Sequence, residues 1–554
     1  MISIFKKLNT HRSIVAVISG LLLASVIFFT NLGNYPFFNP DEALYAEPAL
    51  EMLKSHDFIT TSLNYVTRFT KPPLTIWAMA LSYTFLGVNE MAARLPCALA
   101  GYLTLIVTTL FTLKYFNSRA ALITCFTLAM SPLFIVISRE AITDMILTLF
   151  TTLAGFNLFS SFKENKNPYL AYIMIALAIM TKGPIGLVLP VGGLGLFYII
   201  TGQVKANLKK IKWLELLLIL TSLALPWYVV EIYVTKGAYF KEFILRENFA
   251  RFTGVVDSHK GSIWYHPIVF MVGFFPWSIF FINIIFKLGQ DFNLKLKKFT
   301  LKSLVLDNIS QHTAAIIRKK PQLEIILYCF CQTIFTICFF SASVSKLIPY
   351  TLPAYPFAAI LLGYYLPKLN SQELNFNYTG LFIVSCLTWA ILPKYFYKLR
   401  DTTPEINGLI LNCLLFIIVS SLIYLLINLF NKAKTSLIVF SLLNLFLLAN
   451  FGTACYSLIS ETWEKPVKEF ALALKDKKNP IILYDLRKPS VMFYANRKIL
   501  IPLNYGQFLN CLKLYPDAYI ITKSNDIDKL NTLPKLKLVE TKGMFSLFYN
   551  SSLQ

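Results

Sequence analysis

Several ionisable side chains stand at or beside the ends of apolar segments of this chain. The stretch Asn39–Glu47 (NPDEALYAE) follows the first apolar run and holds three of the 29 acidic residues. Lys71 precedes two prolines, Asp144 opens an apolar run and Lys182 closes another. Lysines and arginines bind phosphate, and a carboxylate can orient or deprotonate an acceptor hydroxyl or stabilise positive charge at an anomeric carbon. The combination favours chemistry on a lipid-linked phosphate.

Each of these residues also has a plainer interpretation. Asp41 and Glu42 can cap a helix expected over 43–55, because Asp is a favoured N-cap and Glu suits a first helical turn. Asp144 can cap the apolar helix that it opens. The others can be ordinary surface or headgroup-level charges: Lys71, Lys182 and His259. It is the gathering of such groups from distant segments that favours a functional site, since ionisable groups at membrane depth are costly unless they pair or face a cavity.

Other common chemistries lack their signatures in this sequence. No Gly-rich phosphate loop or dinucleotide fingerprint is present, which argues against a soluble nucleotide donor. Among the nine cysteines only Cys511 lies in a polar region, and Cys329 and Cys331 lack metal-ligand spacing. The net charge of +23 comes without a basic strip interleaved with aromatic residues, so it indicates membrane topology and not nucleic acid as the partner.

The composition is that of a membrane protein with many spans. The chain is 56% hydrophobic and only 15% charged, against about 25% charged in a soluble domain. Apolar runs of roughly 18 residues recur through most of its length. The first run, Ser13–Phe29, follows Lys6, Lys7 and Arg12 without a small-residue cleavage site after it, so we expect a retained signal-anchor helix.

Charge bias in the short loops predicts a cytoplasmic N-terminus and about 13 transmembrane helices. The expected spans are 13–30, 93–114, 119–138, 144–162, 168–181, 184–201, 213–234, 264–286, 323–344, 348–366, 376–396, 407–430 and 435–457. The apolar segment Leu74–Gly87 is short for a span and suits an interfacial or re-entrant helix. Counting it as a span would place the strongly basic loop 287–321 outside the cell membrane, against the positive-inside rule.

This assignment of transmembrane spans predicts two domains and one polar face at the outer side of the membrane. Residues 1–459 form the transmembrane domain, with 31–92 as a first periplasmic loop, and residues 460–554 form a small periplasmic α/β domain. Its expected strands are PIILYDL, KILIPL, AYIIT, LKLVET and MFSLFY, with a helix near 467–474. The polar residues expected on the outer face are Asp41, Glu42, Glu47, Arg68, Lys71, Arg139, Glu140, Asp144, Lys182, Arg246, Glu247, His259 and Lys346.

Five stretches carry a resemblance to a known superfamily. They are NPDEALYAEPALEMLKSHDFIT, RFTKPPLTIWAMALSYTFLGVNEMAARLPCALAG, SPLFIVISREAITDMILTLF, TKGPIGLVLP and KLIPYTLPAYPFAAILL. In this order they resemble the membrane glycosyltransferases of the protein O-mannosyltransferase superfamily, which have the GT-C fold. Within it, the chain looks most like the bacterial branch that contains the lipid A 4-amino-4-deoxy-L-arabinose transferase.

The resemblance implies an all-α polytopic inner-membrane enzyme that uses a polyprenyl-phosphate sugar, with inversion at the anomeric carbon. The implied acceptor is lipid A, another glycolipid or Ser/Thr of a protein, and membrane lipids surround the enzyme. Together with the residue pattern, it predicts the catalytic carboxylates Asp41, Asp144 and Glu42. The residues expected at the donor phosphate are Lys71, Tyr350, Arg68 and Lys346. Those expected to line the substrate cavity are Tyr45, His259 and Lys182.

One position departs from the branch that the chain most resembles. Aminoarabinose transferases have an acidic residue before the phosphate-binding lysine, associated with a metal, whereas this chain has Thr70. We therefore predict no bound metal or other cofactor, and the departure leaves the sugar open. A lipid-linked sugar transporter is a second interpretation, but paired repeats and midplane polar residues typical of transporters are missing from the sequence. A structural assembly partner without activity is a third.

Overall fold

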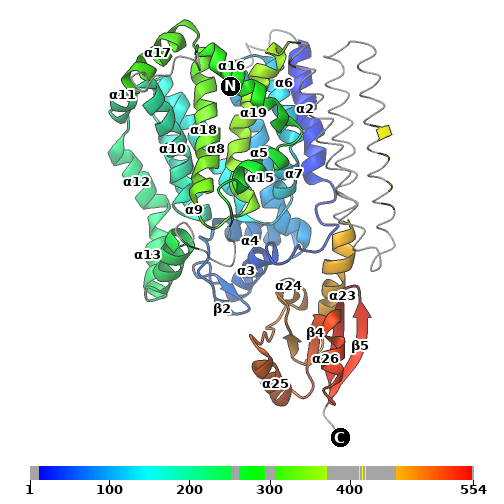
Figure 1. Ribbon diagram of the computed structural model, residues 1–554. Coiled ribbons are helices and arrows are strands. Elements are labelled where there is room, and N and C mark those ends of the chain that lie inside the picture. Colours follow the sequence, from blue (N-terminus) through cyan, green and yellow to red (C-terminus); the bar gives the residue numbers. More distant parts are fainter. Residues whose placement is uncertain are drawn as a thin grey trace.

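The computed structural model describes residues 11–250, 261–293, 306–370 and 457–551, together with the isolated positions 254, 373, 408, 411, 415, 418 and 419. These residues form a helical bundle, with helices α3 (Ala43–Ser55) and α4 (Leu74–Leu86) at one end and a C-terminal region with a β-sheet beyond them (Figure 1). The short helix α11 (Val204–Leu208) and helix α17 (Leu306–Lys319) lie at the opposite end of the bundle. The predicted spans 376–396, 407–430 and 435–457 lie outside the described residues, apart from the isolated positions.

The bundle follows the predicted order of apolar segments. Its elements are α2 (His11–Phe29), α5 (Glu90–Tyr115), α6 (Ser118–Ala129), α7 (Pro132–Ser138), α8 (Thr143–Lys163), α9 (Tyr169–Lys182), α10 (Ile185–Thr201), α12 (Trp213–Leu223), α13 (Leu225–Val234), α15 (Tyr265–Gly273), η2 (Trp277–Phe280), α16 (Phe281–Asp291), α18 (Gln322–Ala342), η5 (Ile348–Ala354) and α19 (Tyr355–Tyr365). Within the described ranges, α5, α8 and α18 are each long and apolar enough to cross a membrane, and three further spans arise if bent helix pairs are counted.

Three predicted spans are broken where a proline interrupts the helix. The α6–α7 pair bends by 65° before Pro132, and α12–α13 bends by 43° close to Pro226. The expected span over 264–286 is the most strongly bent of the three, because α15 and the segment Trp277–Asp291 differ in direction by 113° around Pro276. Proline has no backbone N–H and its ring clashes with the preceding turn, which accounts for the three breaks.

Helices α3 and α4 carry the first loop after α2. Helix α4 has 13 residues and spans about 20 Å, shorter than the roughly 30 Å apolar core of a bilayer, as predicted for Leu74–Gly87. The short strands β1 (Ser62–Leu63) and β2 (Val66–Thr67) pair between these helices. The capping interpretation of Glu42 is wrong, because this residue stands at the N-cap of α3 in helical conformation and its side chain makes no capping bond.

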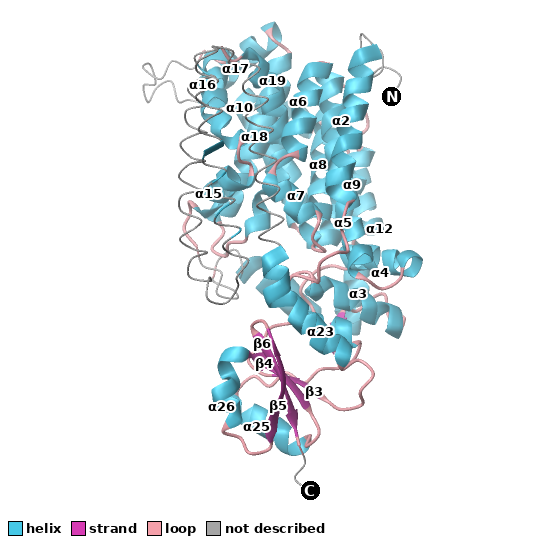
Figure 2. Ribbon diagram, turned by 90° about the vertical axis from the view of Figure 1, so that its right-hand side faces the viewer, coloured by secondary structure: helices cyan, strands magenta, loops and turns pink. Residues whose placement is uncertain are grey.

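The C-terminal region contains a mixed four-stranded sheet with strand order β3-β4-β6-β5. Its strands are β3 (Ile481–Leu483), β4 (Tyr519–Lys523), β5 (Leu536–Lys542) and β6 (Phe545–Asn550), with β3 and β4 parallel and the other pairs antiparallel. Four of the five predicted strands form, whereas KILIPL contributes only an isolated bridge at Leu500. Helix α23 (Lys465–Ala473) lies between the bundle and the sheet, and α24 (Ser490–Ala495), α25 (Tyr505–Leu514) and α26 (Ile527–Asn531) complete the region (Figure 2).

Candidate functional site

A cavity of about 310 Å³ opens where the first loop, the α9–α10 junction and the α18–η5 junction meet. One wall comes from η1 (Phe240–Ala250), a π-helical segment after α13. The lining residues are Lys71, Lys182, Pro184, Ile185, Val188, Glu247, Asn248, Phe339, Phe340, Ser343 and Tyr350. Three residues predicted for one site, Lys71, Lys182 and Tyr350, therefore share one cavity.

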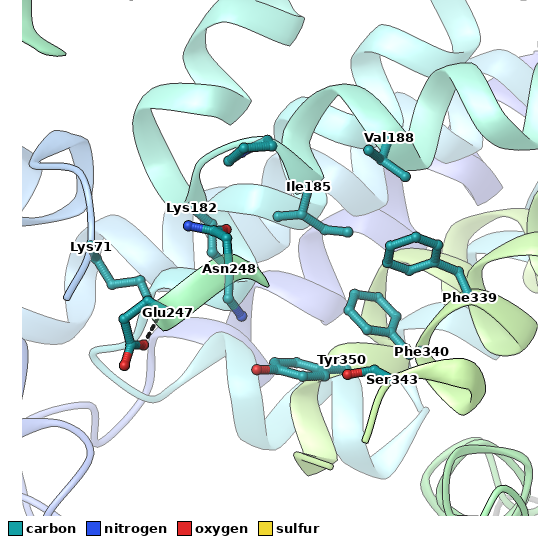
Figure 3. A pocket seen from close by; sticks show the side chains of 11 residues that line it. Lys71, Lys182, Ile185, Val188, Glu247, Asn248, Phe339, Phe340, Ser343 and Tyr350 are labelled. Carbon is teal, nitrogen blue, oxygen red and sulfur yellow. Dashed lines mark hydrogen bonds and ion pairs between the residues drawn. The ribbon is translucent and has the colours of Figure 1, made fainter. Parts of the chain in front are cut away.

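The charged groups gather at one end of this cavity. Lys71 pairs with Glu247 at 3.3 Å, while Phe339 and Phe340 lie at the far end (Figure 3). Lys182 pairs with Asp144 at 2.5 Å, and its ammonium lies 4.6 Å from the ring centroid of Tyr350. Two ammonium groups and a phenol at one mouth are the donor types that bind a phosphate.

Local backbone chemistry aims both lysines at the cavity. Lys182 ends α9, and Gly183 follows with φ +86°, a conformation that side chains other than glycine rarely adopt. A Cβ at this position would also lie only 2.7 Å from Phe243. Lys71 precedes Pro72 and Pro73, whose fixed φ values end the loop before α4 begins. The KGP and KPP motifs are therefore turns that direct a lysine.

The rest of the cavity wall is apolar. Ile185 and Val188 come from the first turns of α10, and Phe339 and Phe340 come from the last turns of α18. These side chains extend from the charged end along the two helices (Figure 3). A groove with two ion-paired lysines at its mouth and an apolar wall can accommodate an amphiphile with a phosphate head and a hydrocarbon tail.

Tyr45 and Arg68 lie beside the charged end. The Arg68 guanidinium is 5.9 Å from the Tyr45 ring centroid and also donates a hydrogen bond to the carbonyl of Leu44. Burial lowers the pKa of Arg68 and raises the pKa of Tyr45, although the positive charges of Arg68 and Lys182 oppose the latter shift. Tyr45 thus lies within electrostatic range of Lys182, but it is not among the residues that line the cavity.

Asp41 is exposed just before α3 and is not among the residues that line the cavity. Its negative charge acts on Glu140, which lies between α7 and α8. Burial, and then the charges of Glu42 and Asp41, raise the pKa of Glu140 to about 8. Asp41 and Asp144 therefore both lie within electrostatic range of one carboxyl group.

Glu42 is fully buried and engaged in structural contacts. It accepts hydrogen bonds from Nε and Nη2 of Arg94, both at 2.7 Å. The backbone N–H groups of Phe38 and Ala141 complete its contacts at 2.9 and 2.8 Å. Its carboxylate therefore links the first loop to α5 and to the start of α8, and these contacts favour a positioning role over the predicted catalytic one.

Another predicted residue, Lys346, is not on the cavity wall. The Lys346 ammonium donates to the carbonyls of Phe340, Ser341 and Ser343, so it caps the C-terminal end of α18. His259 lies outside the described residues. The sequence did not predict Glu247, Asn248 or Arg94 as site residues; the signal that could have identified Arg94 is an ionisable residue inside an apolar segment.

The described residues do not form a metal site. Among them, no group of three or more His, Cys, Asp or Glu side chains could hold a metal ion. Thr70 stands where an acidic ligand would precede Lys71, so the residues present do not fit a metal there.

Comparisons with known proteins point to one kind of enzyme. Residues 70–229 match the family described as dolichyl-phosphate-mannose-protein mannosyltransferase. An uncharacterised protein of Aquifex aeolicus is 30% identical over 399 residues, which covers 71% of this chain and 72% of that protein. An undecaprenyl phosphate-α-4-amino-4-deoxy-L-arabinose arabinosyl transferase of Pectobacterium atrosepticum is 25% identical over 415 residues, covering 70% of this chain and 68% of the relative.

Solved structures share the fold. The structure of ArnT from Cupriavidus metallidurans bound to undecaprenyl phosphate superposes with a TM-score of 0.73 at 20% identity, covering 97% of this chain and 99% of that one. The oligosaccharyltransferase AglB from Archaeoglobus fulgidus gives a TM-score of 0.51 at 11% identity, covering 98% of this chain and 75% of that one.

Proposed function

Because this chain belongs to the GT-C superfamily of membrane glycosyltransferases, in its protein O-mannosyltransferase-like group, we propose that it transfers a sugar from a polyprenyl phosphate to an acceptor at the outer face of the inner membrane. The superfamily and the glycosyltransferase activity predicted from the sequence are confirmed by the relatives and the shared fold. The observation that carries the proposal is the cavity with Lys71, Lys182 and Tyr350 at its mouth and apolar helix surfaces along its wall.

In the proposed reaction, the bond between the anomeric carbon and the donor phosphate oxygen breaks, and the electron pair leaves with the phosphate. An acceptor oxygen forms the new bond from the opposite face of the sugar. Lys71 and Lys182 stabilise the departing phosphate, because charge-assisted hydrogen bonds strengthen as charge develops on it. Asp144 holds Lys182 in place through their ion pair.

Asp41 is proposed to act at the acceptor. If the acceptor is a hydroxyl, its proton passes to Asp41 during the attack. If the acceptor is a phosphate, no proton is removed, and Asp41 orients the reacting groups. The exposure of Asp41 suits either role, since an acceptor reaches this residue from outside the bundle.

Lys71 and Glu247 form an ion pair that lines the cavity, and their side chains are largely buried, with exposed fractions of 12% and 9%. We propose that the Glu247 carboxylate stands where the donor phosphate binds. When the donor binds, its phosphate then replaces the Glu247 carboxylate as the partner of Lys71. The π-helical segment η1 moves and takes Glu247 away from Lys71.

For the substrates, we propose undecaprenyl phosphate-linked 4-amino-4-deoxy-L-arabinose, or a related sugar, with lipid A as the acceptor. The named arabinosyl transferases among the relatives support this choice. The match of 70–229 to protein mannosyltransferases favours an alternative, transfer to Ser/Thr of a protein or to another glycolipid.

We further propose the topology of about 13 spans, with 460–554 as a periplasmic domain and the N-terminus in the cytoplasm. The order of the described helices supports this topology as far as α19. The basic loop before α18 supports the orientation, since it then faces the cytoplasm.

Reconstitution tests the proposed reaction directly. Purified protein in liposomes receives undecaprenyl phosphate-α-4-amino-4-deoxy-L-arabinose and lipid A, and mass spectrometry follows the lipid A mass. The proposal predicts a gain of one aminoarabinose residue, which Lys71→Ala and Lys182→Ala abolish. In cells, unchanged lipid A together with an altered glycoprotein in the presence of the enzyme would select the protein-modifying alternative.

A further inference from the structure

The C-terminal region holds the residues that immediately precede Asp41. Asn39 donates from Nδ2 to Oε2 of Glu464 at 2.6 Å and to Oγ of Ser490 at 2.7 Å. The backbone N–H of Ser490 returns a bond to Oδ1 of Asn39 at 3.0 Å. Both ends of the Asn39 amide are therefore bound by residues more than 400 positions away in the sequence.

Glu464 is a buried and oriented anchor for this contact. Only 4% of the residue is exposed, and its Oε1 accepts a hydrogen bond from the Lys488 ammonium at 2.9 Å. Burial raises the pKa of Glu464, while Lys488 and Asn39 oppose the shift. Glu464 ends the π-helical segment Ser460–Glu464, which leads directly into α23.

A second set of contacts holds Phe37, two residues before Asn39. The backbone N–H of Phe37 donates to the Tyr494 hydroxyl at 2.9 Å, and that hydroxyl donates to Glu90 at 2.9 Å. The Phe37 ring meets Phe493 edge to face with centroids 4.9 Å apart. Helix α24 thus packs directly on the start of the first loop.

Asp41 lies between this attachment and a second one. On its C-terminal side, Glu42 is held by Arg94 and by the N–H of Ala141. On its N-terminal side, Asn39 is held by Glu464. With both flanks fixed, the backbone at 40–41 has little freedom, and an exposed side chain acquires a defined position.

We propose that Glu464 is a positioning residue for Asp41, acting through Asn39, and that the C-terminal region thereby belongs to the catalytic apparatus. The inference rests on the proposed function of Asp41. The Asn39–Glu464 pair is chemically specific, because an amide donates to a carboxylate that Lys488 orients. Exchanging the amide and the carboxylate between positions 39 and 464 must preserve the hydrogen bond. Changing only one of the two residues must loosen the residues before Asp41.

The test compares four full-length variants in liposomes with undecaprenyl phosphate-α-4-amino-4-deoxy-L-arabinose and lipid A. Asn39→Asp places two carboxylates opposite each other, and Glu464→Gln places two amides opposite each other. The double variant restores one donor and one acceptor in reversed order. Glu461→Gln is the matched control, since Glu461 lies in the same π-helical segment in an exposed pair with Lys465.

We expect each single variant to lower kcat about tenfold to hundredfold, because small misplacement of a reacting group costs this much, with little change in the KM for the donor. The double variant recovers most of kcat, and the control stays at the parent rate. Hydrogen exchange of the peptide covering 37–42 rises in both single variants and falls again in the double variant, which measures positioning independently of turnover.

Several results overturn the inference. They are unchanged exchange at 37–42 in the single variants, unchanged kcat with raised exchange, or failure of the double variant to recover. Asp41→Asn, measured in the same assay, distinguishes a failure of the proposed role of Asp41 from a failure of the inference about Glu464. If it transfers at the parent rate, the proposed role of Asp41 fails and the inference fails with it; if it is inactive while Glu464→Gln is fully active, only the inference fails.

Discussion

Replacing Glu42 by glutamine tests whether this carboxylate positions the site or takes part in the chemistry. Glu42 accepts four hydrogen bonds, two at each oxygen, and one bond at each oxygen comes from Arg94. A glutamine keeps one acceptor oxygen and turns an N–H₂ group toward the other two donors. Arg94 is 1% exposed, so its charge would lose its ionic partner inside the protein.

The expected destabilisation follows from these contacts. One lost bond to a charged donor costs about 1.5–3 kcal/mol and one lost bond to a backbone N–H about 1 kcal/mol. The total of about 2.5–4 kcal/mol overlaps the roughly 3–5 kcal/mol lost when a buried ion pair is broken. The retained bonds of Arg94 to the carbonyls of Leu32, Tyr35 and Pro36 keep the residue in place without neutralising it.

The assay is equilibrium unfolding of the purified protein in mixed detergent micelles, followed by transfer activity per folded molecule. Glu461→Gln is the control, because its ion pair is about half exposed and such pairs contribute at most about 1 kcal/mol. Asp41→Asn is expected to keep its stability and lose transfer. Parent-like stability of Glu42→Gln together with lost transfer would refute the positioning role and restore the catalytic assignment.

The remaining predictions concern the cavity and one buried acid. Lys182→Ala weakens binding of undecaprenyl phosphate about 10- to 100-fold, by the loss of one charge-assisted bond, and equal titration curves for the variant and the parent would contradict this. Glu247→Gln frees Lys71 from a competing carboxylate, so undecaprenyl phosphate binds several-fold tighter; weaker binding would mean that Glu247 supports the phosphate site. Burial, and then the Glu51 charge, raise the pKa of Glu47 to about 8. The folded protein therefore keeps a proton that the unfolded chain releases near pH 4.5, so stability falls as pH rises from about 5 to 8. Glu47→Gln removes this component, and thermal unfolding between pH 5 and 8 should show a flatter slope than the parent; identical slopes would contradict the assignment.

The helices of the bundle could be predicted because apolar length and loop charge act locally. The starts of α5 and α8 and the short helix α4 lie within a few residues of the prediction. The bends could not be placed from hydropathy, because a proline that breaks a helix leaves the polarity of the apolar run unchanged, and other prolines, such as Pro96 in α5 and Pro190 in α10, lie inside unbroken helices. Phe274 and Trp277 show the same limit, because the stretch FFPW is typical of an interfacial aromatic belt, whereas both side chains are buried inside the bundle.

The site could be predicted only in part. Lys71 and Lys182 stand in motifs whose turns fix their direction, and both lie with Tyr350 at segment ends that were predicted on the same face. The partners of these residues depend on tertiary contacts that no local pattern encodes. Glu247 reaches Lys71 across 176 positions, and Glu464 reaches Asn39 across 425. Glu42 shows that a motif can identify an important residue, whereas the contacts of that residue in the folded protein determine its role.

The proposed glycosyl transfer requires that Lys71 and Lys182 bind the same donor phosphate. An electron cryomicroscopy structure of the protein with undecaprenyl phosphate in a lipid nanodisc measures this directly. The account predicts the phosphate within about 3 Å of both ammonium groups, Glu247 displaced from Lys71, and the isoprenoid chain along Ile185 and Phe340. A phosphate bound elsewhere, with the Lys71–Glu247 pair intact, would contradict it.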